Sequence, residues 1–338
     1  MLIQKFTTLF KDVTRQGTKI PKEEYLTHGK NIIIDQGQDI IAGYTNCEDG
    51  IFKKIPAIVF GDHTRIIKYV DTPFFLGADG VKVLKCTDKN ANYRYLYYAL
   101  KNAHIPNTGY NRHFKWLKEI TINYPDKNRQ NDIVNILDKL EYIIKMKSQE
   151  LDKFDELIKA RFVEMFGDPQ DSKSKWKKST IEKCCTLKSG KTLPRNIENE
   201  GGNIPYVKVK DMNSLENTTY ITTSTRFVSD KTANKSIFPV GTVIFPKRGG
   251  AIGTNKKRLT KVPICADLNI MGVIPDNTRI SSYYLFEYFN MVDLNTLNNG
   301  SSVPQINNKD INPLNINIPP LSLQNEFANF VHQVDKSK

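Results

Sequence analysis

Long apolar runs and paired cysteine motifs are missing from this 338-residue sequence. It has no apolar stretch of about eighteen residues and no N-terminal apolar segment before a cleavage site, so we expect neither membrane spanning nor secretion. Its five cysteines are odd in number and never in CxxC spacing, which favours reduced core thiols over a zinc site or disulfides. The sequence therefore predicts a cytoplasmic protein without a structural metal.

Several catalytic motifs are missing as well. There is no GxxxxGK[ST] loop for ATP-driven work and no Gly-rich cofactor loop after a strand. An amino-methyltransferase of DNA needs an Asn-Pro-Pro-aromatic loop, and Ile318-Pro319-Pro320-Leu321 lacks both the asparagine and the aromatic. A nuclease needs clustered carboxylates to hold metal, whereas the acidic residues here are dispersed. We predict no catalytic residues and no directly bound metal or cofactor.

Positive charge is what the chain has in excess. The formal net charge is +13 at pH 7, and 39% of the residues are hydrophobic, which is typical of a globular protein. Such a charge favours a polyanionic partner, first nucleic acid and second an anionic membrane surface. Charge alone does not choose between them.

The most regular pattern lies in the middle of the chain, at residues 126–168. Apolar residues recur there at alternating steps of four and three, which is the seam of a long amphipathic or coiled-coil helix. Pro125 ends the preceding segment, Asp126 is a candidate N-cap, and Gly167 followed by Pro169 supplies the stop. At 1.5 Å per residue this helix would be roughly 60 Å long, which suits a spacer. The seam residues that we expect to bind partners are Leu137, Leu140, Ile144, Leu151, Phe154 and Ile158.

The segments on either side of this helix repeat one another. Short β-like runs (IIIDQ, AIVFG, RIIKYV, VKVLK) and an aromatic helix at 93–103 precede it, and similar runs (IPYVKVKDM, GTVIFPKRGG, NIMGVI) and a helix at 283–291 follow it. The aligned pairs are Ala78 with Ala266, Asp79 with Asp267, Tyr95 with Tyr283, Gly109 with Gly300, Pro125 with Pro319, and Gln130 with Gln324. A period of roughly 190 residues is too long for a solenoid and indicates a duplicated domain with its helix.

This pattern predicts an α+β chain with two mixed α/β domains, at 1–125 and 169–318, separated by the central helix at 126–168. Residues 319–338 begin a second, shorter helix, for which Ser322 is a candidate cap. We expect this helix to pair antiparallel with the central one in a coiled coil, because an isolated amphipathic helix is marginal without a partner. Two chains could also associate through this shortened helix.

The ordered repeat resembles the specificity (S) subunits of type I restriction-modification systems. The matching segments are YPDKNRQNDIVNILD and IPPLSLQNEFANFV at the helix starts, GKNIIIDQGQDIIAGYTN and IVFGDHTRIIKYV in the first domain, and SGKTLPRN and GTVIFPKRGGAIG in the second. The resemblance implies two target-recognition domains that read the two halves of a split double-stranded DNA site, with the helices fixing their separation.

The resemblance also implies partners. Two methyltransferase (M) subunits that use S-adenosylmethionine would dock on the helices, and restriction (R) subunits that use ATP and Mg would join outside them. The chain itself would recognise DNA without catalysing a reaction.

In the second domain the strongest DNA-binding candidate is PKRGGAIGTNKKR, where glycines let the backbone approach phosphate and Arg248 can grip a guanine. A solvated basic hairpin is the alternative. Lys208 and Lys210 alternate with valines and so should share one face of a strand. The candidate residues in this domain are Lys191, Arg195, Lys208, Lys210, Lys247, Arg248, Lys256, Lys257, Arg258, Ser302 and Gln305.

In the first domain the candidates are fewer and less basic. Asp62 with His63 lacks a third ligand, so this pair is more typical of a turn than of a metal site. In GYNRHFKW, basic residues alternate with aromatics, which suits binding to a nucleic-acid backbone, although Phe114 and Trp116 are expected in the core. The candidate residues are Tyr44, Thr45, Asn46, His63, Thr64, Arg65, Lys68, Asn111 and Arg112.

Two other functions stay open at this point. A stand-alone nuclease would cut DNA in the presence of magnesium, and a coiled-coil scaffold would be indifferent to DNA. A DNA-binding protein should instead lose affinity steeply as salt is added, because it releases counterions from the phosphates.

Overall fold

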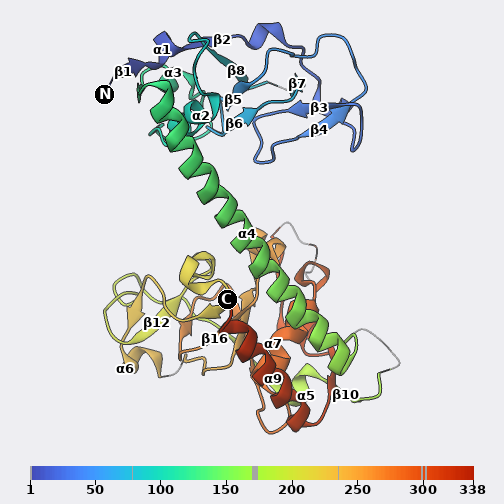
Figure 1. Ribbon diagram of the computed structural model, residues 1–338. Helices are drawn as coiled ribbons and strands as arrows, with labels where there is room; N and C mark the ends of the chain where they lie inside the picture. The colour runs from blue at the N-terminus through green and yellow to red at the C-terminus, as the bar shows by residue number, and fades with distance from the viewer. Residues whose placement is uncertain (1, 78, 170–173, 235, 298–299, 301–302) are drawn as a thin grey trace. The chain divides into compact units, whose positions relative to one another are not determined.

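The computed structural model describes residues 2–77, 79–169, 174–234, 236–297, 300 and 303–338. The chain divides into two compact units, Met1–Met146 and Lys147–Lys338, so the division falls inside the long helix α4 (Lys127–Phe166). We call them unit 1 and unit 2 (Figure 1). Among the described residues, no helix is both long and apolar enough to cross a membrane.

Unit 1 has a four-stranded sheet in the order β2-β8-β5-β6, a three-stranded sheet β4-β3-β7, and the pair β1-β9. The elements are β1 (Ile3–Lys5), α1 (Phe6–Leu9), β2 (Phe10–Asp12), β3 (Asn31–Ile34), β4 (Gly43–Thr45), β5 (Ala57–Gly61), β6 (Ile67–Val70), β7 (Phe74–Leu76), β8 (Val81–Cys86), α2 (Tyr93–Lys101), α3 (Phe114–Leu117) and β9 (Thr121–Asn123). All four predicted strand segments and the aromatic helix are therefore confirmed.

Strand β5 separates two apolar layers of unit 1. Ile58 and Phe60 pack with Leu96 of α2, whereas Val59 packs with Phe74 of the smaller sheet. Alternate residues of a strand point to opposite faces, so an uninterrupted apolar run, AIVF, is what a strand buried on both faces requires.

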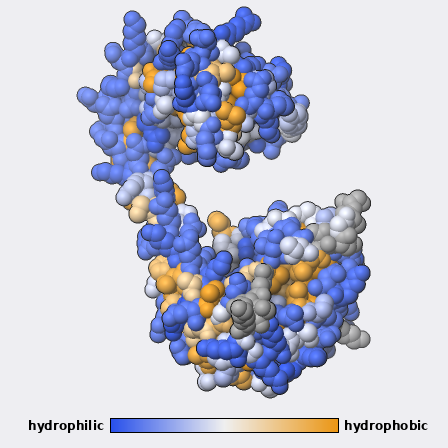
Figure 2. Space-filling view, turned by 90° about the vertical axis from the view of Figure 1, so that its right-hand side faces the viewer, coloured by the Kyte–Doolittle hydropathy of each residue, from blue (hydrophilic) through white to orange (hydrophobic). Residues whose placement is uncertain are grey.

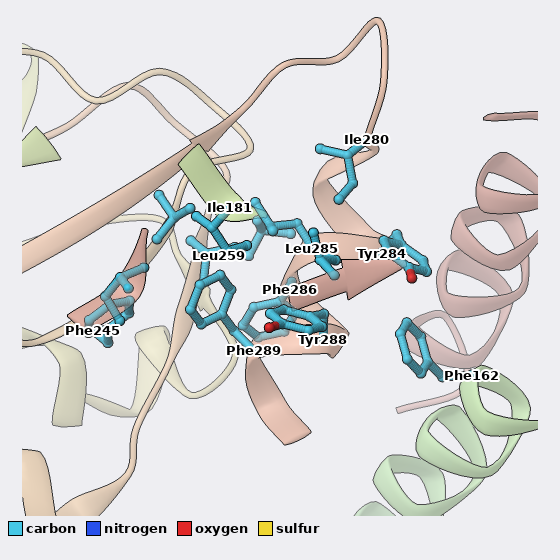
Figure 3. Close-up of a cluster of buried hydrophobic side chains, with 14 of the residues drawn as sticks. Phe162, Ile181, Phe245, Leu259, Ile280, Tyr284, Leu285, Phe286, Tyr288 and Phe289 are labelled. Carbon is cyan, nitrogen blue, oxygen red and sulfur yellow. The ribbon is translucent and has the colours of Figure 1, made fainter. Parts of the chain in front are cut away.

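Unit 2 has the same plan with a larger main sheet, in the order β11-β18-β15-β16-β13, beside β14-β12-β17 and the pair β10-β19. Its elements are β10 (Lys177–Thr180), α5 (Ile181–Cys184), β11 (Cys185–Ser189), β12 (Ile204–Val207), β13 (Tyr220–Ile221), β14 (Phe227–Val228), α6 (Asp230–Ala233), β15 (Val243–Pro246), β16 (Arg258–Thr260), β17 (Cys265–Ala266), β18 (Ile270–Pro275), α7 (Ser282–Met291), α8 (Asn308–Ile311), β19 (Asn315–Ile318) and α9 (Leu321–Asp335). Helix α7 lies against the main sheet, and Phe289 stacks on Phe245 of β15 at 5.7 Å (Figure 3).

The duplication extends to single hydrogen bonds. In unit 1 the buried amide of Gln130 accepts from the backbone N–H of Asn92, at 3.0 Å, and donates to the carbonyl of Pro125. In unit 2 Gln324 accepts from the backbone N–H of Ser281, at 2.7 Å, and donates to the carbonyl of Pro319. Asn92 and Ser281 are the N-caps of α2 and α7. The predicted pairing of Gln130 with Gln324 is therefore confirmed, and we call this arrangement the glutamine latch.

Two of the aligned pairs need correction. Asp267 corresponds to Gly77, not to Asp79, because the backbone N–H of each donates to the last residue of the neighbouring parallel strand, Val207 and Ile34 respectively. The hydroxyl of Tyr95 donates to the carbonyl of Asn123 in β9, and Tyr284, not Tyr283, makes the equivalent bond to Asn317 in β19. Tyr95 and Tyr284 are both the third residue of their helices. The alignment by sequence was one residue out because two adjacent tyrosines, at 283 and 284, fit the pattern equally well.

The ends of α4 agree with the sequence. The carboxylate of Asp126 accepts from the backbone N–H of Arg129 at 3.0 Å, which caps the first turn. Gly167 has φ +79° and donates to the carbonyl of Val163 at 2.8 Å, which is a typical glycine termination of a helix. The expected cap of the second helix is wrong, because α9 begins at Leu321 with Pro320 at the N-cap and no side-chain cap.

Helix α9 packs antiparallel to the part of α4 that belongs to unit 2. Phe327 meets both Phe162 and Phe166 edge-on, with ring centroids 5.4 and 5.7 Å apart. Two ion pairs follow the antiparallel order of the helices: Arg161 pairs with Glu326 at 3.1 Å, and Asp155, earlier in the chain, pairs with Lys338, later in the chain, at 2.7 Å. Figure 3 shows Phe162 facing Tyr284 of α7, so the three helices share one apolar cluster.

Candidate nucleic-acid interface

In unit 2 two loops meet beyond the end of β15. The backbone N–H of Gly249 donates to the carbonyl of Pro304 at 2.8 Å, and that of Ile306 donates to the carbonyl of Lys247 at 2.9 Å. Between these bonds, Arg248 and Gln305 form an isolated β-bridge. The side chain of Arg248 is exposed. The two segments that carry predicted DNA-binding residues, far apart in sequence, therefore form one ledge, which we call loop pair 2 (246–255 with 303–306).

Two of the three glycines of loop pair 2, Gly249 and Gly250, face open space. Residues Gly249–Thr254 form a short 3-10 helix, not the simple hairpin considered from the sequence. A Cβ atom placed on Gly249 or Gly250 would meet no atom within 4 Å. A bulky ligand such as a sugar-phosphate backbone could therefore approach the peptide groups directly.

In unit 1 the corresponding loops meet in the same way. The backbone N–H of His113 donates to the carbonyl of Asp62 at 2.8 Å, as that of Ile306 does to Lys247. The N–H of Asp62 donates to Gly80, which leads into β8, and that of Lys247 donates to Asn269, which leads into β18. We call this arrangement loop pair 1 (61–66 with 105–113). Asp62 and Lys247 thus occupy equivalent positions.

The buried carboxylate of Asp62 locks loop pair 1. It accepts from the backbone N–H of Phe114 at 2.7 Å, while the backbone carbonyl of Asp62 lies 3.0 Å from Nδ1 of the buried His113. Arg65 adds a third link, because its Nη1 donates to the carbonyl of Ile105 at 3.1 Å. The prediction that Asp62 with His63 forms a turn agrees with this geometry.

Five predicted DNA-binding residues are used inside the protein. Lys68 is 4% exposed, and its ammonium donates to the carbonyl of Asp39 and lies 3.5 Å from Asp35. Burial lowers the pKa of Lys68 despite the neighbouring Asp35. Thr45 is also buried, and Lys247 donates to the hydroxyl of Ser189 at 2.8 Å. Lys68, Thr45 and Lys247 are thus buried residues, which argues against the direct DNA contact predicted for them.

Lys257 and Arg258 are the other two, and both line a cavity of about 600 Å³ in unit 2. Lys257 donates to the carbonyl of Val292 at 2.6 Å, and burial lowers its pKa to about 8. Arg258 donates from Nε to the carbonyl of Asn217 at 2.6 Å. These cations were predicted on the exposed loop, but Arg258 begins β16 and Lys257 directly precedes it, and both are held by backbone carbonyls.

Lys208 and Lys210 do not share a strand face. Strand β12 ends at Val207, and a 3-10 helix follows at Asp211–Asn213. The buried carboxylate of Asp211 accepts from the backbone N–H of Lys208, at 2.8 Å, and so turns the chain. Lys208 pairs with Glu198, and this hydrogen bond lowers the pKa of that carboxyl. The alternation of lysine and valine was misleading because Asp211 ends the strand.

The remaining candidates are at the surface or half-buried. Ser302 lies outside the described residues, and the side chain of Gln305 donates to Asn307 at 2.7 Å. Lys256 is half-buried and hydrogen-bonded to Asn213. Tyr44, His63 and Arg65 are half-buried. The exposed candidates are Asn46, Thr64, Asn111, Arg112, Lys191, Arg195, Lys210 and Arg248.

Comparison with known proteins also shows two similar parts in the chain. The model of the family described as the type I restriction modification DNA specificity domain matches residues 8–153 and again residues 173–338. The chain belongs to this family. The first match covers most of unit 1 and extends seven residues into unit 2, to residue 153, and the second lies wholly in unit 2.

Two individual relatives are similar over nearly the whole chain. The specificity subunit of the type I restriction enzyme EcoR124I/EcoR124II from Escherichia coli is 24% identical over 330 residues, which are 90% of this chain and 79% of that protein. The crystal structure of a type I restriction-modification S subunit from M. genitalium superposes with a TM-score of 0.59 at 19% identity, covering 99% of this chain and 89% of that one. The second comparison shows that the specificity-domain fold is shared.

The seam of α4 is only partly available to partners of this specificity protein. Ile158 is buried in the core of unit 2, Phe154 packs against that core, and Leu137 packs against the core of unit 1. The burial of Ile158 argues against the predicted contact of this residue with a partner. The exposed apolar residues of α4 are Ile136, Leu140, Ile143, Ile144 and Met146 in unit 1, and Leu151, Leu157 and Val163 in unit 2.

The sequence did not single out Gln36 or Tyr110 as site residues. Gln36 accepts from the backbone N–H of His63 at 3.1 Å and donates to the carbonyl of Asp79 at 3.2 Å. It therefore joins loop pair 1 to two other turns of the specificity domain. No spacing rule reveals a glutamine of this kind, whereas Tyr110, which is 86% exposed, lies in an aromatic and basic stretch that did give a signal.

Proposed function

We propose that the chain is the DNA-binding specificity subunit of a type I restriction-modification complex and that it reads a bipartite site, one half-site for each unit. The observation that carries this proposal is the recurrence of the same loop pair in both units on the same hydrogen-bonded scaffold. A duplicated ledge with different side chains is what recognition of two unlike half-sites requires, because base edges are read by side chains.

The exposed side chains of the two ledges differ in chemistry. Loop pair 1 presents Tyr110, Asn111 and Arg112, whereas loop pair 2 presents Arg248 beside three glycines. Arginine is the usual bidentate partner of guanine, and asparagine can pair with adenine in the major groove. The net charge of +13 adds attraction to phosphates that does not depend on sequence.

The exposed apolar residues of α4 support docking of partner subunits. Ile136, Leu140 and Ile143 are each about half exposed or more, at 59%, 49% and 54%, and their spacing places them on one side of the helix. We expect two methyltransferase subunits to bind the helices, with restriction subunits joining outside. The surface in Figure 2 is mostly hydrophilic, with hydrophobic residues emerging in both units.

The chain itself is proposed to be non-catalytic. S-adenosylmethionine, ATP and Mg would be bound by the partner subunits, and the chain would act in the cytoplasm with them. Self-association of two chains through the helix at 319–338 stays a prediction, which the mass of the purified chain at high concentration would test. No specific observation favours a nuclease or a scaffold.

Co-expression with the cognate methyltransferase subunit, followed by long-read mapping of modified adenines, tests the proposal. We expect one two-part motif with a fixed gap. Arg248→Ala should relax one part only, whereas Lys336→Ala, which removes an exposed lysine at the end of α9, should leave the motif unchanged. A complex that forms but methylates without any motif would overturn the proposal.

A further inference from the structure

The most exposed aromatic side chain of unit 1 lies at the tip of loop pair 1. Tyr110 is 86% exposed, yet its ring is stacked on that of His63, with centroids 4.8 Å apart and an angle of 12° between the planes. One face of the tyrosine is therefore covered and the other is open to a ligand. An unsupported tyrosine at a loop tip would lose more conformational entropy on binding than one already held in place.

His63 is itself fixed from below. Its backbone N–H donates to Gln36, and the next residue, Thr64, donates its hydroxyl to the carbonyl of Gln36 at 2.7 Å. The Nδ1 atom of His63 is buried and has no hydrogen-bond partner among the described residues. The ring thus serves as a stacking surface, since its buried nitrogen makes no polar link.

The loop that carries Tyr110 is held at both ends. Arg65 holds the carbonyl of Ile105, and His113 is hydrogen-bonded to Asp62. Between these points Gly109 has φ +78°, and the N–H of Asn111 donates to its carbonyl at 2.8 Å. A turn of this kind projects the residue at its centre, which is Tyr110.

We propose that Tyr110, backed by His63, is a specificity-determining residue that packs its open ring face against a base pair of the half-site read by unit 1. This inference rests on the proposed function and adds the residue that reads that half-site. The chemistry of the loop supports this proposal. The exposed Arg112 supplies positive charge for the phosphates, and the aromatic face of Tyr110 suits a thymine methyl group or an opened base step. Because the Tyr110 ring is already stacked on His63, it loses less conformational entropy when it packs against a base pair.

The test uses the full chain and a duplex library with a randomised central region, sequenced after binding. A labelled duplex with the enriched motif then gives the affinity. We expect Tyr110→Ala to relax one part of the motif and to weaken binding roughly 5- to 100-fold, the range for loss of one base contact. His63→Ala should act on the same part more weakly, and Tyr110→Phe should keep the motif, because it retains the ring.

Two controls separate the possible outcomes. Tyr142→Ala removes another exposed tyrosine, 65% exposed on α4, and should change neither part of the motif. Thermal unfolding followed by circular dichroism should match between the chain and Tyr110→Ala, because this side chain is almost entirely outside the core. If the unaltered chain enriches no motif, the proposed function fails. If it enriches a motif that Tyr110→Ala reads equally well, the proposed function stands and the inference on Tyr110 is overturned.

Discussion

Arg248 and Lys247 are neighbours in sequence, but replacing the first should change DNA affinity and replacing the second should change stability. Arg248 is exposed on loop pair 2, whereas Lys247 is 9% exposed and donates to Ser189. The sequence treats both as DNA-binding cations. The structure predicts that Arg248→Ala weakens DNA binding and that Lys247→Met changes stability instead.

The expected magnitudes follow from these environments. Loss of an arginine that reads a base costs about 1–3 kcal/mol of binding free energy and relaxes specificity at that position. If Arg248 also neutralises one phosphate, the slope of log K against log salt should become less steep by about 0.9. For Lys247→Met, one hydrogen bond is lost but a buried charge is removed as well, so we expect a change in unfolding free energy within about 1–2 kcal/mol.

Fluorescence anisotropy with a labelled duplex at several salt concentrations, together with urea unfolding, measures both quantities. Arg248→Ala should shift affinity and leave the urea midpoint unchanged, because its side chain is outside the core. Lys247→Met should keep the salt slope of the unaltered chain. The assignment of the two residues would be refuted if Lys247→Met flattened the salt slope while Arg248→Ala did not.

Three further predictions concern stability. Gln324→Leu removes the three hydrogen bonds that join a fully buried amide to Ser281, Pro319 and Arg279. It should lower the free energy of urea unfolding by about 2–4 kcal/mol. The control Ser322→Ala, at an exposed site without a cap bond, should lower it by less than about 0.5 kcal/mol. Burial lowers the pKa of Lys257 from the ordinary lysine value of 10.5 to about 8, so between these two pH values the folded state binds fewer protons than the unfolded one. The contribution of Lys257 to stability should therefore rise with pH across that window. The unfolding free energy of the unaltered chain should increase relative to that of Lys257→Met between pH 8 and 10, and an unchanged difference would contradict this. Gly249→Ala should destabilise by about 1–2 kcal/mol because φ is +70°, whereas Gly250→Ala, with equal open space and no left-handed φ, should be nearly neutral in thermal unfolding.

Much of the scaffold could be predicted from the sequence, because it depends on patterns local to each segment. The apolar run of β5 and the punctuation of α4 by Asp126 and Gly167 are examples, and each was found where expected. The repeat was also visible, since Gln130 and Gln324 follow prolines at the same spacing. Such features need no knowledge of distant contacts.

The availability of individual cations could not be predicted in the same way. Lys68 and Lys257 are residue types that often bind phosphate, but their ammonium groups donate to carbonyls that are distant in sequence, those of Asp39 and Val292. Likewise the strand predicted through Lys208 ends at Val207, because the carboxylate of Asp211 accepts from the backbone N–H of Lys208 and turns the chain. Whether a lysine faces water is decided by tertiary packing.

The equivalences between the two units explain how one fold can serve two half-sites. The residues with the same role in both, such as Gln130 with Gln324 and Tyr95 with Tyr284, bind backbone groups, and a substitution there would break the scaffold. At the loop pairs the backbone bonds are the same, yet the exposed residues differ, with Tyr110 and Arg112 in unit 1 and Arg248 in unit 2. A backbone hydrogen bond does not depend on side-chain identity, so each ledge can keep these bonds while its exposed side chains change. The buried side chains of Asp62 and Lys247 bond within the protein instead, so substitution there would affect the fold.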